Sequence, residues 1–372
     1  MGRLEHVGRI VWVPLVLCAL LWLTWTVGVN ILGAEYIGIT LNLLVTAVLV
    51  IGLQIFSGNS GILSFGHIAF MALGAYSSAL LTIPPDIKKV TFTSMPGFLD
   101  WILDVELGTL SSTLVAGLFA AAFGLIMATP IVRLSGVPAG IATLALLVIV
   151  YTFNIQTTSI TRGTSTMIGV PNTTTAESAL LWGCLAVIVA FVYQASRSGV
   201  RLRGARENEA AARSVGVNVP LERGKAWVLS AFVMGVGGAL YGHYIIAFSA
   251  GEFYFDITFL IVLMLVIGGL TSVSGAVVGT IFIGIVREGL RRIEIGPLEG
   301  SLPGFAELVL AVILVLVLIV RPRGLTGGHE IPWIGDWRNG RLKSLGRSSE
   351  PAPAAGDGSA ASAVSSSSLD RP

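Results

Sequence analysis

The chain has 372 residues, of which 54% are hydrophobic and only 12% are charged. Soluble domains are usually about 45–50% apolar and about 25% charged, so this composition excludes an ordinary water-soluble enzyme. The formal net charge of +2 is too small to indicate a protein that binds nucleic acid. The two cysteines, Cys18 and Cys184, lie in apolar runs and form neither a disulfide framework nor a metal site.

Apolar segments follow one another along most of the chain. About 20 helical residues cross a hydrocarbon core roughly 30 Å thick. Ten segments can be placed so that Glu307 is the only charged residue inside any of them. They are Ile10–Gly28, Gly38–Ser57, Ile62–Thr82, Thr109–Thr129, Val137–Phe153, Ala179–Ala195, Ala226–Ala247, Ile257–Thr271, Val273–Val286 and Phe305–Val320. The sequence therefore predicts an all-α, polytopic bundle of about ten transmembrane segments in a lipid bilayer.

The eighth and ninth segments are short and adjacent, so they form either two short spans or one re-entrant hairpin. Both alternatives return the chain to the same side of the membrane. About twice as many lysines and arginines lie in the connections on the N-terminal side as in those on the opposite side, which predicts that both termini are inside. Arg287, Arg291 and Arg292 are the exception, because this topology places them outside.

The first polar interruption is the stretch from Ser57 to Tyr76. Its glycines predict a tight cytoplasmic turn between the second and third segments. Polar groups inside a membrane are candidates for function. We therefore expect Asn59, Ser64, His67 and Tyr76 to line the translocation path; the alternative is that His67 only bonds a neighbouring helix near the interface.

The second interruption is the long basic loop of residues 196–225. Arg206–Val215 is rich in good helix formers, and Gly216 can take the left-handed conformation that ends a helix. The small face formed by Ala211, Ala212 and Val215 suits a protein groove, although an ordinary solvated loop would have the same composition.

The C-terminal part differs in composition. Arg321, Pro322 and Arg323 mark the end of the last segment, and residues 351–372 are rich in Ala, Ser, Pro and Gly. We expect a membrane domain over residues 1–325 and a disordered cytoplasmic tail over residues 326–372.

The chain lacks the motifs of catalysis. Its one Gly-Lys pair, Gly224-Lys225, lacks the other residues of a P-loop, and no cluster has metal-ligand spacing. We therefore expect no enzymatic activity, cofactor or metal site in this chain.

Several of these stretches occur together in one order: Ser57–Tyr76, Arg206–Gly216, Val228–Tyr244, Ile267–Gly279 and Arg321–Leu325. This order resembles the branched-chain amino-acid permeases of ABC importers, of the LivM type, over about residues 35–325. The resemblance implies a subunit of the inner or plasma membrane for branched-chain or hydrophobic amino acids. Its implied partners are a homologous second permease, two cytoplasmic ABC ATPase subunits, in which ATP hydrolysis resides, and an external substrate-binding protein.

The resemblance also implies that the basic loop contains the helix that couples to the ATPases. The family pattern there is Glu-Ala-Ala, three residues and then Gly, and Ala210 stands in place of its glutamate. The expected coupling residues are Arg206, Glu207, Asn208, Glu209, Ala211, Ala212 and Gly216. Urea or short amides remain alternative substrates. A cation-coupled secondary transporter remains an alternative mechanism, with Glu307 as its one candidate intramembrane acid.

Overall fold

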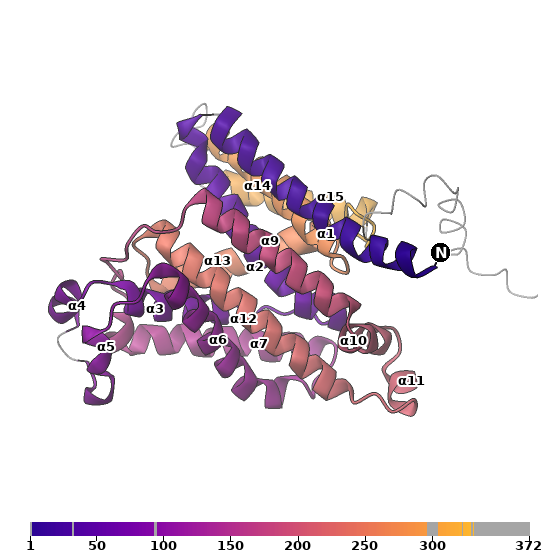
Figure 1. Ribbon diagram of the computed structural model, residues 1–372, viewed down its shortest axis with the longest axis horizontal. Helices are drawn as coiled ribbons and strands as arrows, with labels where there is room; N and C mark the ends of the chain where they lie inside the picture. Colours follow the sequence, from indigo (N-terminus) through magenta and orange to yellow (C-terminus); the bar gives the residue numbers. More distant parts are fainter. Residues whose placement is uncertain are drawn as a thin grey trace, which may run out of the picture. The chain divides into compact units, whose positions relative to one another are not determined.

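The computed structural model describes residues 2–31, 33–92, 95–295, 304–321, 323–328 and 330, which belong to a compact unit of residues 1–331. The described residues contain no strand, and Met167 and Phe248 form an isolated antiparallel bridge. Each of the ten apolar segments lies mostly in a helix (Figure 1). These helices are α1 (Gly2–Thr26), α2 (Ile37–Ser60), α3 (His67–Thr82), α6 (Thr109–Ile131), α7 (Val137–Gln156), α9 (Ala176–Ala195), α12 (Val219–Ile245), α13 (Phe255–Gly268), α14 (Val273–Ile295) and α15 (Phe305–Val320).

The prediction of an all-α polytopic bundle is confirmed. In the described part of the chain, eight helices are long and apolar enough to cross a membrane. The number is nine if α3 and the short α4 (Pro85–Thr91), which meet at a 115° bend, count as one span. The predicted number of about ten spans is larger than eight or nine because α3 and α15 are each too short to count as a span alone. In particular, α3 begins at His67, five residues after the predicted start at Ile62. Most of the tail expected over residues 326–372, namely residues 329 and 331–372, and the side chain of Glu307 lie outside the described residues.

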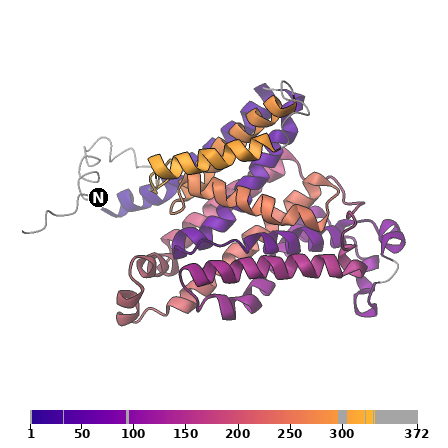
Figure 2. The same cartoon turned by 180° about the vertical axis from the view of Figure 1, so that it is seen from behind.

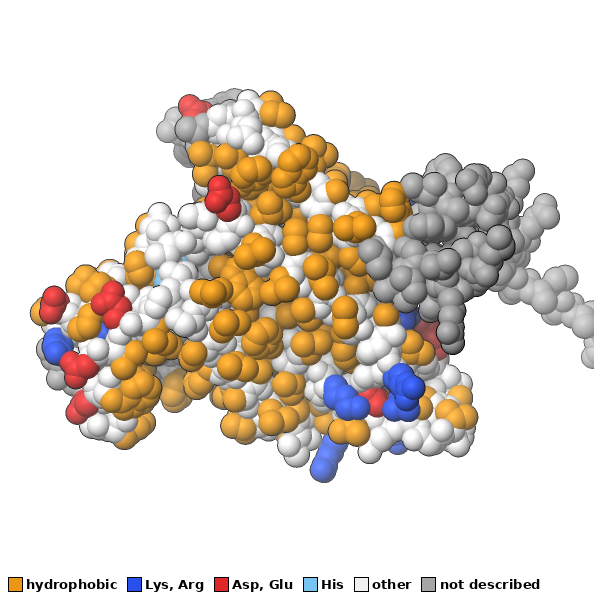
Figure 3. Space-filling view, viewed as in Figure 1, with side chains coloured by type: hydrophobic (Ala, Val, Ile, Leu, Met, Phe, Trp, Pro, Cys, Tyr) orange, Lys and Arg blue, Asp and Glu red, His pale blue; other side chains and the backbone are white. Residues whose placement is uncertain are grey.

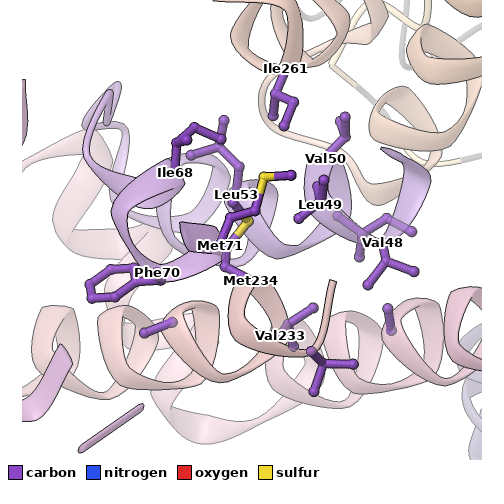
Figure 4. Close-up of a cluster of buried hydrophobic side chains, with 14 of the residues drawn as sticks. Val48, Leu49, Val50, Leu53, Ile68, Phe70, Met71, Val233, Met234 and Ile261 are labelled. Carbon is purple, nitrogen blue, oxygen red and sulfur yellow. The ribbon is translucent and has the colours of Figure 1, made fainter. Parts of the chain in front are cut away.

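Two helices, α2 and α12, lie at the centre of the bundle. α12 packs against α2, α3 and α6, and α2 also packs against α9, α13 and α14 (Figures 1 and 2). A helix that is apolar on every face is buried, and α2 is of this kind. Leu49 and Leu53 of α2 lie with Met71 of α3 and Met234 of α12 in the apolar core (Figure 4).

Glycines allow the central helices to approach closely. A Cβ atom on Gly238 of α12 would lie 2.0 Å from the carbonyl oxygen of Met71 of α3. One on Gly74 of α3 would lie 2.1 Å from the carbonyl oxygen of Gly235 of α12. Helices in lipid gain stability from such small-residue contacts because van der Waals packing, rather than the hydrophobic effect, drives their association.

The connections between helices lie at two opposite ends of the bundle, and hydrogen bonds show which of them share an end. At one end, Arg206 Nη1 donates to the carbonyl oxygen of Gly58 over 2.7 Å, and the Leu325 N–H donates to that of Ile267 over 2.8 Å. We call this the loop end. At the opposite end, the Tyr244 hydroxyl donates to the carbonyl oxygen of Gly38 over 3.1 Å. Charged side chains gather over α4 and α5 (Trp101–Asp104) and over α10 and α11, with a broad apolar band between (Figure 3).

Helices α13 and α14 both run between these two ends. The turn between them lies at the loop end, where a Cβ atom on Gly58 would lie 2.6 Å from the carbonyl oxygen of Leu270. At the opposite end, the Arg292 guanidinium of α14 lies 4.5 Å from the centre of the Tyr36 ring. α14 extends nine residues beyond the predicted end at Val286. This arrangement favours two crossing helices over a re-entrant hairpin.

Candidate functional site

The basic loop folds into two short helices, α10 (Arg197–Glu207) and α11 (Glu209–Ser214). The sequence predicted one helix over Arg206–Val215, but Asn208 interrupts it with an extended backbone (φ −151°, ψ 103°). The Asn208 side chain then accepts a hydrogen bond from the Ala211 N–H over 3.0 Å and caps α11, as asparagine commonly does at a helix start. Gly216 has φ +83°, so the predicted left-handed end of the helix is confirmed.

The small residues of α11 face in two directions. Ala212 is buried and packs with Ala205 of α10, Val219 of α12 and the half-buried Val217. Ala211 is exposed, and Val215 is 79% exposed at the tip of the loop. An exposed apolar tip beside small side chains is a surface that a partner protein can cover. The exposed small and apolar side of the loop therefore includes Ala211, Val215 and Gly216, whereas Ala212 belongs to the core of the loop.

Ion pairs hold α11 against the membrane helices. The carboxylate of Glu209 lies 2.8 Å from Arg223 Nη2 of α12 and 2.5 Å from Arg213 Nη2. The Arg223 side chain is only 5% exposed and also donates to the carbonyl oxygen of Leu134 over 3.3 Å. Burial raises the pKa of the Glu209 carboxyl group, but hydrogen bonds and charge from Arg223 and Arg213 outweigh it, so the pKa lies below its usual value. Sequence analysis missed Arg223 because a single arginine near a helix start carries no distinctive pattern.

Arg206 connects this loop to the turn between α2 and α3. Its Nη1 donates to the carbonyl oxygen of Gly58, and its Nη2 lies 2.7 Å from Glu207 Oε1. Gly61, with φ +74°, leaves room for the arginine stem, because a Cβ atom there would lie 2.6 Å from Arg206 Cγ. The structure therefore places Arg206 against the membrane domain.

Of the four residues expected along the translocation path, Ser64 and His67 directly follow that turn and Asn59 lies in the last turn of α2. Asn59, Ser64 and His67 are each 1% exposed. The Asn59 Nδ2 donates to the carbonyl oxygen of Ile55 over 2.9 Å, whereas its Oδ1 has no described partner. His67 Nδ1 lies 2.6 Å from Ser64 Oγ. His67 therefore bonds its own connection, not a neighbouring helix.

The rest of the His67 ring is enclosed by aromatic side chains. Its centroid lies 4.8 Å from that of Trp227, 5.3 Å from that of Phe56 and 5.7 Å from that of Phe70. Among the described residues no group bonds its Nε2.

Tyr76 lies apart from those three residues. It follows His67 by nine residues along α3, a rise of about 13 Å at 1.5 Å per residue. Its ring packs against Phe248 and Phe253, with centroids 5.1 and 6.0 Å away. Its buried hydroxyl has no partner among the described residues.

The residues after the last apolar helix form a strap across the turn between α13 and α14. The Thr326 N–H donates to the carbonyl oxygen of Gly268 over 3.1 Å. The Glu330 carboxylate accepts from the N–H groups of Val273 and Ser274 over 2.8 and 3.0 Å, which caps the start of α14. Packing with the membrane helices thus extends to Glu330, five residues beyond the boundary expected at Leu325. The sequence pattern there indicated only a generic end of a span.

The comparisons with known proteins agree with this architecture. A family model described as the permease component of the branched-chain amino acid transport system matches residues 36–320. The high-affinity branched-chain amino acid transport system permease protein LivM of Escherichia coli K12 is 26% identical over an alignment of 312 residues that covers 75% of this chain and 67% of that protein. No solved structure matches the chain.

One further relative is named for the same substrate class and another for a different one. The probable branched-chain amino acid transport permease protein LivH of Methanocaldococcus jannaschii is 28% identical over 151 residues, with 40% of this chain and 44% of that protein covered. The nucleoside ABC transporter permease protein NupC of Lactococcus lactis is 27% identical over an alignment of 274 residues that covers 68% of this chain and 79% of that protein.

Proposed function

The chain belongs to the family of branched-chain amino acid permease components and is a multi-pass inner-membrane subunit of an ABC importer, and from that premise we propose its specific role. It imports branched-chain or other hydrophobic amino acids and forms the translocation path with a homologous second permease. ATP is hydrolysed by separate cytoplasmic subunits, and an external binding protein delivers the substrate. The family match over residues 36–320 carries this proposal.

The ATPase subunits dock on the exposed face of α11. Ala211, Val215 and Gly216 form this face, and Glu209 fixes α11 to Arg223 at the start of α12. Because the attachment is ionic and partly buried, a displacement of α11 by the ATPases is transmitted to α12. The loop also supplies the cytoplasmic positive charge that sets the orientation.

A second connection runs through Arg206 to the turn at Gly58. Gln54 lies beside that turn, since a Cβ atom on Gly58 would lie 2.7 Å from Gln54 Nε2. Its amide is buried without a described partner. Movement of the turn would change the surroundings of Gln54, Asn59 and His67 together. Their unpaired atoms support the proposal, because a second state of the transport cycle that pairs these atoms would be favoured by their hydrogen bonds.

Reconstitution tests the proposed function. Proteoliposomes that contain both permeases and the ATPases, with binding protein outside and ATP inside, should accumulate leucine. Liposomes without the ATPase subunits should not, even with a proton or sodium gradient. Uphill uptake driven by a cation gradient alone would support a secondary transporter instead.

Arg206→Gln tests the connection through Gly58. This variant should keep its ATPase subunits but show lower leucine uptake per ATP hydrolysed, because the docking face is intact and the link to the turn is broken. Arg162→Gln, at the opposite end of the molecule, is the matched control. Wild-type coupling in Arg206→Gln would contradict this relay.

A nucleoside is the second candidate substrate, because the Lactococcus relative is a nucleoside permease. Competition separates the two classes in the same proteoliposomes. Excess unlabelled isoleucine should suppress uptake of labelled leucine, whereas uridine should not. Uptake of labelled uridine in the absence of leucine uptake would favour the nucleoside assignment.

A further inference from the structure

A cavity of about 470 Å³ lies between α2, α13 and α14, beside the end of α12. Sites for small ligands usually have volumes of about 300–1,000 Å³. The cavity extends inward from the end of the molecule opposite the loop end. Glu35 lies at its mouth and Thr46 lies 11 residues further along the chain, a rise of about 16 Å if the path is helical. Asn59, Ser64, His67 and Tyr76 do not line it.

Charges of both signs surround the mouth. The lining includes three arginines and two glutamates, so its formal net charge is +1. Glu288 is already paired, with its carboxylate 3.0 Å from Arg291 Nε and 2.9 Å from Arg292 Nε. Arg287 and Glu35 form no ion pair with another described residue. One cationic and one anionic side chain therefore remain available for a ligand.

The deeper wall combines polar and apolar groups. Asn42 Oδ1 accepts a hydrogen bond from Thr46 Oγ1 over 3.0 Å, which leaves the Asn42 Nδ2 hydrogens without a described partner. Leu43, Leu260 and Met264 supply apolar surface on α2 and α13. The cavity thus offers a cation, an anion, an amide donor and an apolar wall within one volume.

We propose that this cavity binds the zwitterion of an amino acid with an alkyl side chain, between Arg287 and Glu35. The guanidinium of Arg287 holds the α-carboxylate, for which a planar cationic donor is well matched. Glu35 holds the α-ammonium group, and the alkyl chain lies against Leu43 and Met264. This proposal rests on the proposed function for its substrate class.

The assignment also explains the exception in the charge pattern. Arg287, Arg291 and Arg292 violate the expected excess of positive charge on the inner side. Ionisable residues are costly within a membrane protein and usually have a function there. The positive-inside rule does not account for these arginines, whereas a role in lining the cavity does.

Substrate protection of an introduced thiol tests the proposal directly. In a chain with Cys18→Ala and Cys184→Ala, assembled with its partner subunits in liposomes, Asn42→Cys should react with a charged thiol reagent added outside. Leucine at ten times its Kd should slow that reaction about tenfold by mass action. Both 4-methylpentanoate, which lacks the ammonium, and 3-methylbutylamine, which lacks the carboxylate, should fail to protect.

Matched variants identify the groups responsible. Phe282→Cys, on an exposed face of α14 outside the cavity, should not react with the charged reagent. Arg287→Gln should abolish leucine protection, whereas Lys89→Gln, an external cation paired with Asp104, should keep it. Thr46→Cys replaces Asn42→Cys if the latter does not assemble.

Different results would contradict the cavity proposal and the proposed function. No reaction at either thiol, no protection by leucine, equal protection by the analogues or unchanged protection in Arg287→Gln would each overturn the proposal. Reaction in detergent that phospholipid, not leucine, suppresses would identify a lipid site. If liposomes import leucine while the cavity shows no protection, this proposal fails and the proposed function stands; if they import no leucine, the proposed function fails first.

Discussion

At the scale of single residues, two apolar side chains three positions apart in the loop have opposite roles. Ala212 is buried within the loop, whereas Val215 projects from it. Composition cannot distinguish them, because both suit a docking helix equally well. Only the packing of Ala212 against Ala205 and Val219 separates a residue that holds the loop together from one that a partner touches.

Val215→Asp should weaken binding of the ATPase subunits without changing the melting temperature of the permease. A charge at an exposed site leaves the fold intact but places an unpaired carboxylate in the proposed contact. Ala212→Trp should instead lower the melting temperature, since overpacking typically costs about 1–3 kcal/mol. Co-purification of the ATPases and thermal unfolding measure the two effects. Full ATPase binding by Val215→Asp would mean that the tip is not part of the contact.

The ion pair of Glu209 makes the loop sensitive to acid. The pKa of Glu209 is lower in the folded protein, so its contribution to stability is present at neutral pH and is lost as the pH falls through that lowered pKa. Hydrogen exchange of the α11 amides, corrected for intrinsic rates, should accelerate in this acid range. Glu209→Gln should exchange rapidly even at neutral pH. Identical protection in both proteins at neutral pH would show that Arg223 does not hold α11 in place.

At the scale of elements, contacts between residues distant in sequence are made where helices are interrupted. The break at Asn208 separates α10 from α11, and the turn after Gly268 receives the strap that ends at Glu330. Local sequence indicated where helices stop, but not which distant segment satisfies the exposed backbone groups. Glu330 performs that task for α14 from 57 residues away in sequence.

Glu330→Ala should lower the free energy of unfolding by about 0.5–2 kcal/mol, the usual effect of removing a helix cap. Truncation after Glu330 should preserve stability, whereas truncation after Leu325 should reduce it at least as much as Glu330→Ala does. Thermal unfolding of the purified permease compares the three chains. Equal melting temperatures for both truncations would show that the strap adds nothing to stability.

At the scale of the whole molecule, the contacts divide the connections into two groups without stating which faces the cytoplasm. The charge pattern supplies that direction. Asn172→Cys, in an exposed connection at the opposite end, should react with an impermeant thiol reagent added outside intact cells. Ala210→Cys, exposed on α11, should react only after the membrane is opened. The reverse pattern would invert the topology.

The all-α membrane architecture, the family and the positions of the main helices could be predicted from the sequence alone. Apolar length and the exclusion of charge from lipid act locally, so they can be read along the chain. The sequence also located the loop helix and the glycine that ends it, because the left-handed conformation of Gly216 is a property of one residue.

Which polar groups meet could be seen only in the folded molecule. Arg206 and Gly58 are 148 residues apart, and the mouth of the cavity joins Glu35 to Arg287 from helices at opposite ends of the sequence. The packing of Tyr76 against Phe248 and Phe253 and the burial of Ala212 also depend on neighbours from other elements. Such pairings result from packing between distant segments, and no local pattern in a single chain records them.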